Sequence, residues 1–144
     1  MTPVQIEAVK TSFAHIRPIA DQAGILFYDR LFEVAPQLRP LFKGDIRDQS
    51  RKLMTMLGTV VDGLDDIDDM IPAIEALGRR HRDYQINDAD YATVGQALLW
   101  TLEQGLGDAF TPEVREAWTA AYALVATTMQ KAASKSDSSG PLAS

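Results

Sequence analysis

Residues 71–81 read IPAIEALGRRH, and their apolar positions recur at the three- and four-residue spacing of a helix. The positions that share this helical face are Ile71, Ile74, Leu77, Gly78 and His81. Because such a face packs toward a core, the sequence predicts that His81 points inward. A buried imidazole is either a core histidine bonded to a polar neighbour or a metal ligand, and this stretch alone leaves both interpretations open.

Helical patterns extend over the rest of the chain, and no segment alternates as a β-strand does, so the predicted fold class is all-α. Thr2 and Gln5 predict a capping box at the first helix, and Asp45 is expected to cap the third. Prolines and glycines mark the other boundaries. The first predicted helix begins at Pro3 and ends near Pro18, the second runs from about Ile19 to Val34, and the third follows Asp45 with an inward face up to Leu64. The His81 helix comes next, one helix starts at residues 87–90 and ends at 105–107, and the last starts at residues 111–113.

The inward faces of these helices carry apolar side chains at helical spacing. We expect burial of Ile6, Val9, Phe13 and Ile16; of Ile25, Tyr28, Leu31 and Phe32; of Leu53, Leu57, Val60 and Leu64; of Tyr91, Val94, Leu98 and Leu102; and of Trp118, Tyr122, Val125 and Met129. The acidic run at residues 65–69 is expected to form a solvated corner between helices, and His15 to lie on the surface.

The composition predicts one globular domain, at residues 1–133 of 144, because 46% of the chain is hydrophobic and 24% is charged. Residues 134–144 are rich in serine and poor in apolar side chains, so we expect a disordered C-terminal tail. The chain has no cysteine, which excludes disulfides, thiolate metal sites and iron–sulfur clusters. Any metal ion must therefore be held by nitrogen or oxygen.

The charge and hydropathy of the chain bear on its surroundings. A net charge of −6 argues against nucleic acid as a partner, because phosphates require a basic surface. No apolar run approaches the ~20 residues of a membrane span, and the N-terminus does not resemble a secretory signal. We therefore expect a cytoplasmic protein without a membrane partner.

Three polar residues occupy positions that are otherwise apolar: His81, Gln49 at the head of the Leu53 stripe, and Tyr28 in the run IleLeuPheTyr at 25–28. Each alone is ordinary, because a buried tyrosine usually finds a backbone acceptor and a glutamine near a helix start is usually exposed. Together they fit one site. A flat apolar cofactor between the Gln49 and His81 helices would be held by imidazole on one side and face the donors Tyr28 and Gln49 on the other, as in a haem pocket.

With these motifs, residues 3–133 resemble the globin family, and within it the bacterial single-domain globins of the flavohaemoglobin branch. The resemblance rests on Tyr28, Pro36 and Phe42, on Gln49 with Leu53, on LGRRH at 77–81, on YATVG at 91–95, and on Trp118 with Tyr122. It implies a three-over-three helical sandwich around one haem b, with His81 as the proximal iron ligand.

The resemblance also assigns the haem contacts. Phe42 would pack on the haem face, Leu53 and Leu57 would cover it, and the lower and inner edges would be lined by Leu77, Ile86, Val94 and Leu98. Lys52, Arg79 or Arg80 would reach the propionates.

The leading functional prediction is reversible, high-affinity binding of dioxygen. Tyr28 and Gln49 are hydrogen-bond donors, and dioxygen bound to ferrous haem carries partial negative charge. Donors therefore stabilise bound dioxygen more than they stabilise bound carbon monoxide. The enzymatic alternative is a nitric oxide dioxygenase served by an external reductase, since no flavin or nicotinamide domain is recognisable in the chain. A haem-based gas sensor and a haemless regulator with a globin fold are the other hypotheses, and both are less favoured.

The chain departs from the family pattern on the proximal side. In flavohaemoglobin-type domains a tyrosine and a glutamate support the proximal histidine, and Tyr91 matches the tyrosine. Ala133 falls at the glutamate position, with the neutral Gln130 nearby. Because outer hydrogen bonds tune the basicity of a ligand, the resemblance implies a weaker electron push and favours binding over oxidative turnover.

Overall fold

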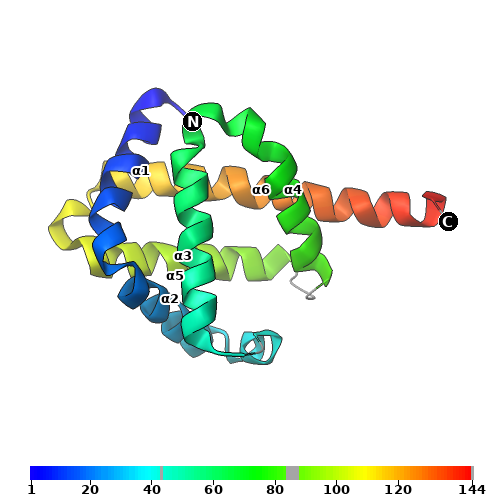
Figure 1. Cartoon of the computed structure of the whole chain (residues 1–144), viewed down its shortest axis with the longest axis horizontal. Helices are drawn as coiled ribbons and strands as arrows, with labels where there is room; N and C mark the ends of the chain where they lie inside the picture. Colours follow the sequence, from blue (N-terminus) through cyan, green and yellow to red (C-terminus); the bar gives the residue numbers. More distant parts are fainter. Residues whose placement is uncertain (43, 84–87, 144) are drawn as a thin grey trace.

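The computed structural model describes residues 1–42, 44–83 and 88–143, without the side chains at 41, 77, 79–83, 88 and 133–143 (Figure 1). These residues form six α-helices and no strand, which confirms the all-α prediction. The helices are α1 (Pro3–Ile16), α2 (Ala20–Val34), α3 (Ile46–Asp62), α4 (Ile67–Asp83), α5 (Asp88–Leu106) and α6 (Pro112–Ala143). Short 3-10 turns connect them at η1 (Arg17–Ile19), η2 (Pro36–Leu41), η3 (Leu64–Asp66) and η4 (Gly107–Ala109).

The predicted helix starts are confirmed at α1 and α3. Thr2 accepts a hydrogen bond from the Gln5 backbone, and the Gln5 side chain accepts one from the Thr2 backbone, which completes the capping box. Asp45 accepts from the Arg47 backbone at 2.8 Å. Each cap satisfies amide groups that the first helical turn leaves without a partner.

The helices pack in two layers, with α1, α3 and α4 over α2, α5 and α6 (Figure 1). Across the layers α1 and α4 pack on α6, and α3 packs on α2. Figure 1 shows α3 crossing steeply over α5 and α6. This is the predicted three-over-three arrangement.

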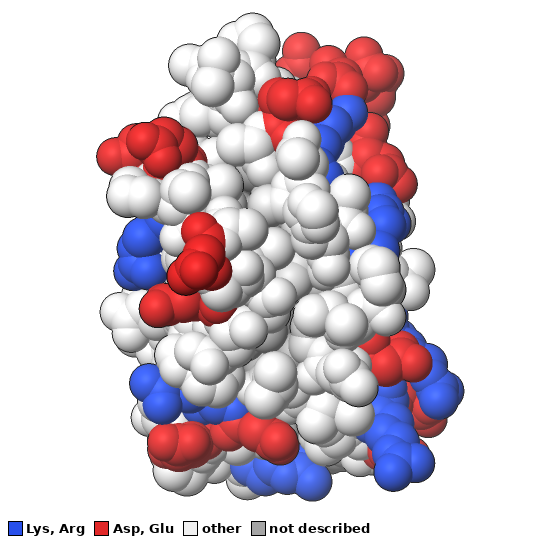
Figure 2. Space-filling model, turned by 90° about the vertical axis from the view of Figure 1, so that its left-hand side faces the viewer, with Lys and Arg blue, Asp and Glu red and all other residues white. Residues whose placement is uncertain are grey.

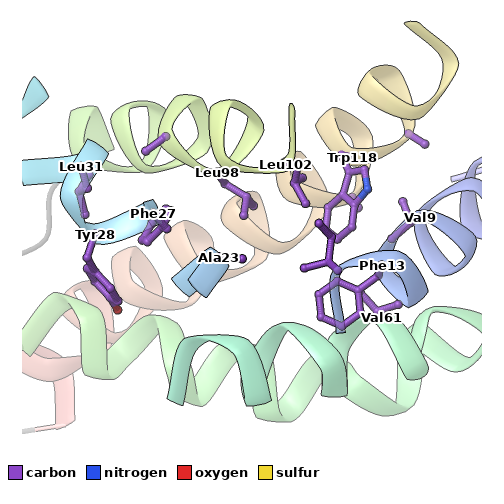
Figure 3. Close-up of a cluster of buried hydrophobic side chains, with 14 of the residues drawn as sticks. Val9, Phe13, Ala23, Phe27, Tyr28, Leu31, Val61, Leu98, Leu102 and Trp118 are labelled. Carbon is purple, nitrogen blue, oxygen red and sulfur yellow. The ribbon is translucent and has the colours of Figure 1, made fainter. Parts of the chain in front are cut away.

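A core of aromatic and aliphatic side chains joins the layers (Figure 3). At one end the Trp118 ring packs 6.0 Å from the Phe13 ring, and its indole Nε1 donates to the buried Ser12 hydroxyl at 2.8 Å. At the other end lie Phe27, Tyr28 and Leu31 of α2. The single polar group of the tryptophan is thus satisfied within the core.

The structure corrects three details of the sequence prediction. Leu64 is buried, but it lies in η3 after α3 has ended at Asp62. The acidic run is only partly a corner, because Asp68 and Asp69 form the first turn of α4, where carboxylates stabilise the positive end of the helix dipole. In α2, Ile25 is half-buried, whereas Phe27, which was not predicted inward, is buried.

The end of α6 differs from the predicted tail. The helix continues to Ala143 and projects beyond the other helices (Figure 1), whereas composition predicts disorder from residue 134. The domain limit at residue 133 and the disordered tail at residues 134–144 stay predictions.

The surface is mixed in charge. The face in Figure 2 carries acidic and basic groups along its margins, with acidic groups gathered at the upper right, and a broad uncharged area near its centre. Near the acidic run, Lys10 of α1 pairs with Asp65, and that hydrogen bond raises the pKa of Lys10. None of the described helices has the length and apolar character needed to cross a bilayer.

Two glycines let helix backbones approach closely. At Gly24 of α2, an added Cβ would lie 2.7 Å from the Ser50 Cβ of α3. At Gly78 of α4, an added Cβ would lie 2.4 Å from the Met129 carbonyl oxygen of α6. Real Cβ atoms do not approach other atoms so closely, so both crossings require glycine.

Gly78→Ala is expected to destabilise the protein by about 3 kcal/mol, because its Cβ would meet the backbone of α6, which cannot rotate away. Gly58→Ala is the matched control, since its Cβ would meet the flexible end of Arg17 at 3.2 Å and alanine favours a helix by up to about 1 kcal/mol. Urea unfolding of both variants measures the difference. Equal stability of the two variants would show that the α4–α6 contact is looser than the structure indicates.

Candidate functional site

A cavity of about 150 Å³ lies among α2, α3, α5 and α6. Its volume is about five times the ~30 Å³ that a water molecule takes up in the liquid, so a diatomic gas fits inside it. The described wall is aliphatic and aromatic, and its polar atoms belong to Tyr28, Tyr91, Trp118 and Tyr122. Such a wall, with few polar groups, is typical of a cofactor site.

Most of the predicted site residues that the structure describes meet at this cavity. Those that line it are Tyr28, Phe42, Leu53, Leu57, Tyr91, Val94 and Leu98. Gln49 is half-buried one turn before Leu53 but does not line the cavity, and Lys52 is exposed. The structure therefore brings Tyr28 to the wall and leaves Gln49 beside it.

The predicted proximal residues fall largely outside the described part. The backbone of His81 belongs to the last turn of α4, but its side chain and those of Leu77, Arg79 and Arg80 are outside the description, as is all of Ile86. The side chain of Ala133 is outside it as well. His15, the other histidine of the chain, is exposed, as the sequence predicts.

Tyr28 is a buried polar residue of the cavity wall. Its side chain is 5% exposed, and its ring packs edge-on to Phe27 at 5.0 Å and to Phe42 at 5.3 Å. Burial raises the pKa of Tyr28 to about 12, so its hydroxyl keeps its proton at neutral pH. Figure 3 shows the ring pointing away from Leu31 with the hydroxyl oxygen at its tip.

No residue in the described part of the chain hydrogen-bonds to the Tyr28 hydroxyl, although other polar groups of the wall are paired. Tyr122 donates to the Tyr91 backbone carbonyl at 2.6 Å, and burial raises the pKa of Tyr122. Trp118 donates to Ser12, outside the cavity. The Tyr28 hydroxyl is not one of the fully buried polar atoms without a partner, and the residue lines the cavity, so its hydroxyl is open to a ligand there.

Several wall residues were not predicted from the sequence. Met56 lies one turn after Leu53, and the three-residue spacing was the signal that could have placed it on the wall. Phe27 lines the cavity beside Tyr28, and α2 therefore presents adjacent residues to it, which a single helical stripe does not predict. Val60, Trp118, Tyr122, Val125 and Met129 were predicted inward but were not assigned to the site.

The described wall suits a haem group in its chemistry, but the free space of about 150 Å³ is below the roughly 300–1,000 Å³ of typical cofactor pockets, so the wall would have to move apart around a porphyrin. An apolar wall suits the faces of a porphyrin, and the unpaired Tyr28 hydroxyl suits a polar ligand within it. On the side of α6, Ala126 and Met129 belong to the wall and also pack with Ile74 of α4, the helix that contains His81. Because the chain has no cysteine, it cannot bind haem iron through a thiolate, but a histidine can bind the iron through its ring nitrogen.

Comparison with known proteins gives the same family. The globin family model matches residues 25–129. The neuroglobin of Danio rerio is 32% identical, with 75% of this chain and 77% of the relative covered. The neuroglobin of Chaenocephalus aceratus is 31% identical over the same shares. The flavohemoprotein of Bacillus subtilis (strain 168) is 28% identical over 84% of this chain, but this match covers 31% of the longer relative. The chain belongs to the globin family.

Proposed function

We propose that this globin holds haem b and binds dioxygen reversibly with high affinity. Membership of the family supports a haem-binding, gas-binding protein. The observation that supports the finer proposal is the buried residue Tyr28, which lines an apolar cavity and whose hydroxyl has no hydrogen-bond partner among the described residues.

His81 is proposed as the iron ligand, in the last turn of α4. Phe42, Leu53 and Leu57 would pack on the porphyrin, and so would Val94 and Leu98 from α5. By the family resemblance Leu77 and Ile86 would complete the wall, and Lys52 or Arg80 would reach the propionates. When bound, haem supplies a ferrous iron that takes up a diatomic gas.

Tyr28 would distinguish dioxygen from carbon monoxide. A donor favours the ligand that carries more negative charge, and a hydrogen bond to a charged acceptor contributes roughly 1.5–3 kcal/mol. The tyrosine ring is fixed by Phe27 and Phe42, so little side-chain freedom is lost when the hydroxyl donates. Gln49 is proposed as a second, weaker donor, because it is half-buried and has more rotatable bonds.

The proximal side supports binding more than oxidative turnover. Tyr91 is 8% exposed and lines the cavity, where it is proposed to support His81. The glutamate expected from the family pattern is replaced by Ala133. A neutral environment leaves the imidazole less basic, so we place nitric oxide dioxygenation with an external reductase second.

His81→Ala is expected to abolish stable haem binding, because His15 is the only other histidine and the chain has no cysteine. His15→Ala is the control and should bind haem as the wild type does, since His15 is exposed on α1. Titration of the haem-free protein with haem, followed at the Soret band, measures both. Wild-type haem affinity in His81→Ala would refute the proximal assignment.

Tyr28→Phe is expected to accelerate dioxygen release about tenfold or more, whereas Gln49→Leu has a smaller effect. Phenylalanine keeps the ring that packs on Phe42, so the variant removes the donor alone. Release of carbon monoxide should change little in either variant. Stopped-flow and flash photolysis give these rates, and an unchanged dioxygen rate in Tyr28→Phe would exclude Tyr28 as the donor.

The same hydroxyl predicts an alkaline loss of stability. Burial raises the pKa of Tyr28 from 10.0 to about 12 in the folded protein, so the unfolded chain loses this proton first. The contribution of the protonated Tyr28 hydroxyl to the free energy of unfolding is complete below pH 10, and it is lost as the pH rises through about 12. Between these values the wild type should lose about 2 kcal/mol more than Tyr28→Phe. Unfolding free energies of the two proteins from pH 9 to 12 test this, and parallel curves would contradict it.

A further inference from the structure

Three rings form an aromatic cluster at one end of the cavity: Tyr28 and Phe32 from α2, and Phe42 at the end of η2. The centroid distances from Phe42 are 5.3 Å to Tyr28 and 5.5 Å to Phe32, and both pairs are edge-on. Phe42 and Tyr28 line the cavity. The place of Phe42 therefore determines how well the Tyr28 ring is covered.

The backbone of Phe42 is held by Arg39. The Phe42 amide donates to the Arg39 carbonyl at 3.1 Å, and Arg39 Nη1 donates to the Phe42 carbonyl at 3.2 Å. The same guanidinium lies over the Phe32 ring, 5.2 Å from its centroid. One exposed side chain thus joins the backbone of one ring residue to the face of another.

We propose that Arg39 is a positioning residue for the proposed gas site: it fixes Phe42 against Tyr28 and so keeps water away from the donor hydroxyl. Phe42 is half-buried and ends η2 in an extended conformation, with φ −101° and ψ 98°, so no further helical turn holds it. Without Arg39 its carbonyl is left to solvent and its ring is free to move outward.

The guanidinium suits this role better than an ammonium group. Its plane can stack on Phe32 while an edge N–H donates to the Phe42 carbonyl, whereas a lysine Nζ cannot stack in the same way. The effect should therefore depend on the guanidinium group and not on the positive charge alone.

Arg30 provides a matched control on the neighbouring part of α2. Its guanidinium also lies over an aromatic ring, 5.0 Å from the centroid of Trp100, and pairs with Glu33 at 3.3 Å. Trp100 is not among the described residues that line the cavity. Arg30→Ala thus removes the same kind of contact from a place where the proposal predicts no effect.

The experiment uses the haem-loaded full chain with Arg39→Ala, Arg39→Lys and Arg30→Ala. The first readout is the nuclear Overhauser effect between the Tyr28 and Phe42 rings in the carbon monoxide form, which reports their contact without reference to dioxygen. The second is the dioxygen release rate. Arg39→Ala should weaken the ring contact and accelerate release about threefold to tenfold, Arg39→Lys should recover less than half of the loss, and Arg30→Ala should match the wild type.

An unchanged ring contact in Arg39→Ala would overturn the proposal, and so would an equal loss in Arg30→Ala or full recovery in Arg39→Lys. As a second variant, Arg39→Ala in a Phe42→Leu background should add nothing to Phe42→Leu, because the two residues act through one contact. The expected effect on dioxygen release rests on the proposed function. The variant Tyr28→Phe therefore distinguishes a failure of the donor role of Tyr28 from a failure of the positioning role of Arg39. Loss of the ring contact with unchanged release in both Tyr28→Phe and Arg39→Ala would refute the donor role of Tyr28 and leave the positioning role intact.

Discussion

The site depends on two close approaches between helix backbones. At Gly24 the α2 helix meets Ser50 of α3, and at Gly78 the α4 helix meets the Met129 backbone of α6. Tyr28 lies one turn beyond Gly24 on α2, and Leu53 lies one turn beyond Ser50 on α3. Both side chains line the cavity. One turn beyond Gly78 lies His81. The glycines that bring the helices together therefore also set the separation of the residues proposed to act on a bound gas.

The helical fold was predictable because its signals are local. Thr2, Gln5 and Asp45 mark helix starts through hydrogen bonds within one turn, and the spacing of Val9, Phe13 and Ile16 marks an inward face. The end of α3 at Asp62 and the start of α4 within the acidic run were not predictable in this way. Both depend on contacts between this corner and α1, such as the pair of Lys10 with Asp65. The tail at residues 134–144 was predicted from composition alone, and the structure continues α6 to Ala143.

For the site, the sequence identified residues but not their relations. Tyr28 was predicted inward, yet only the structure shows that Phe42 covers its ring and that Tyr122 bonds elsewhere. Gln49 was placed with Tyr28 from its position on the helical stripe and from the family resemblance, and one helical position decides whether a side chain reaches the cavity or stops beside it.

Ser50 has a further consequence. It is 1% exposed, and its hydroxyl has no hydrogen-bond partner among the described residues. Its Cβ fills the space that glycine leaves at position 24. Positions 24 and 50 therefore share one small volume. In related chains a larger side chain at position 24 should occur together with glycine at position 50, and a larger side chain at position 50 should occur together with glycine at position 24. Such paired variation would indicate that the distance between α2 and α3 is kept constant, even where neither residue contacts a ligand.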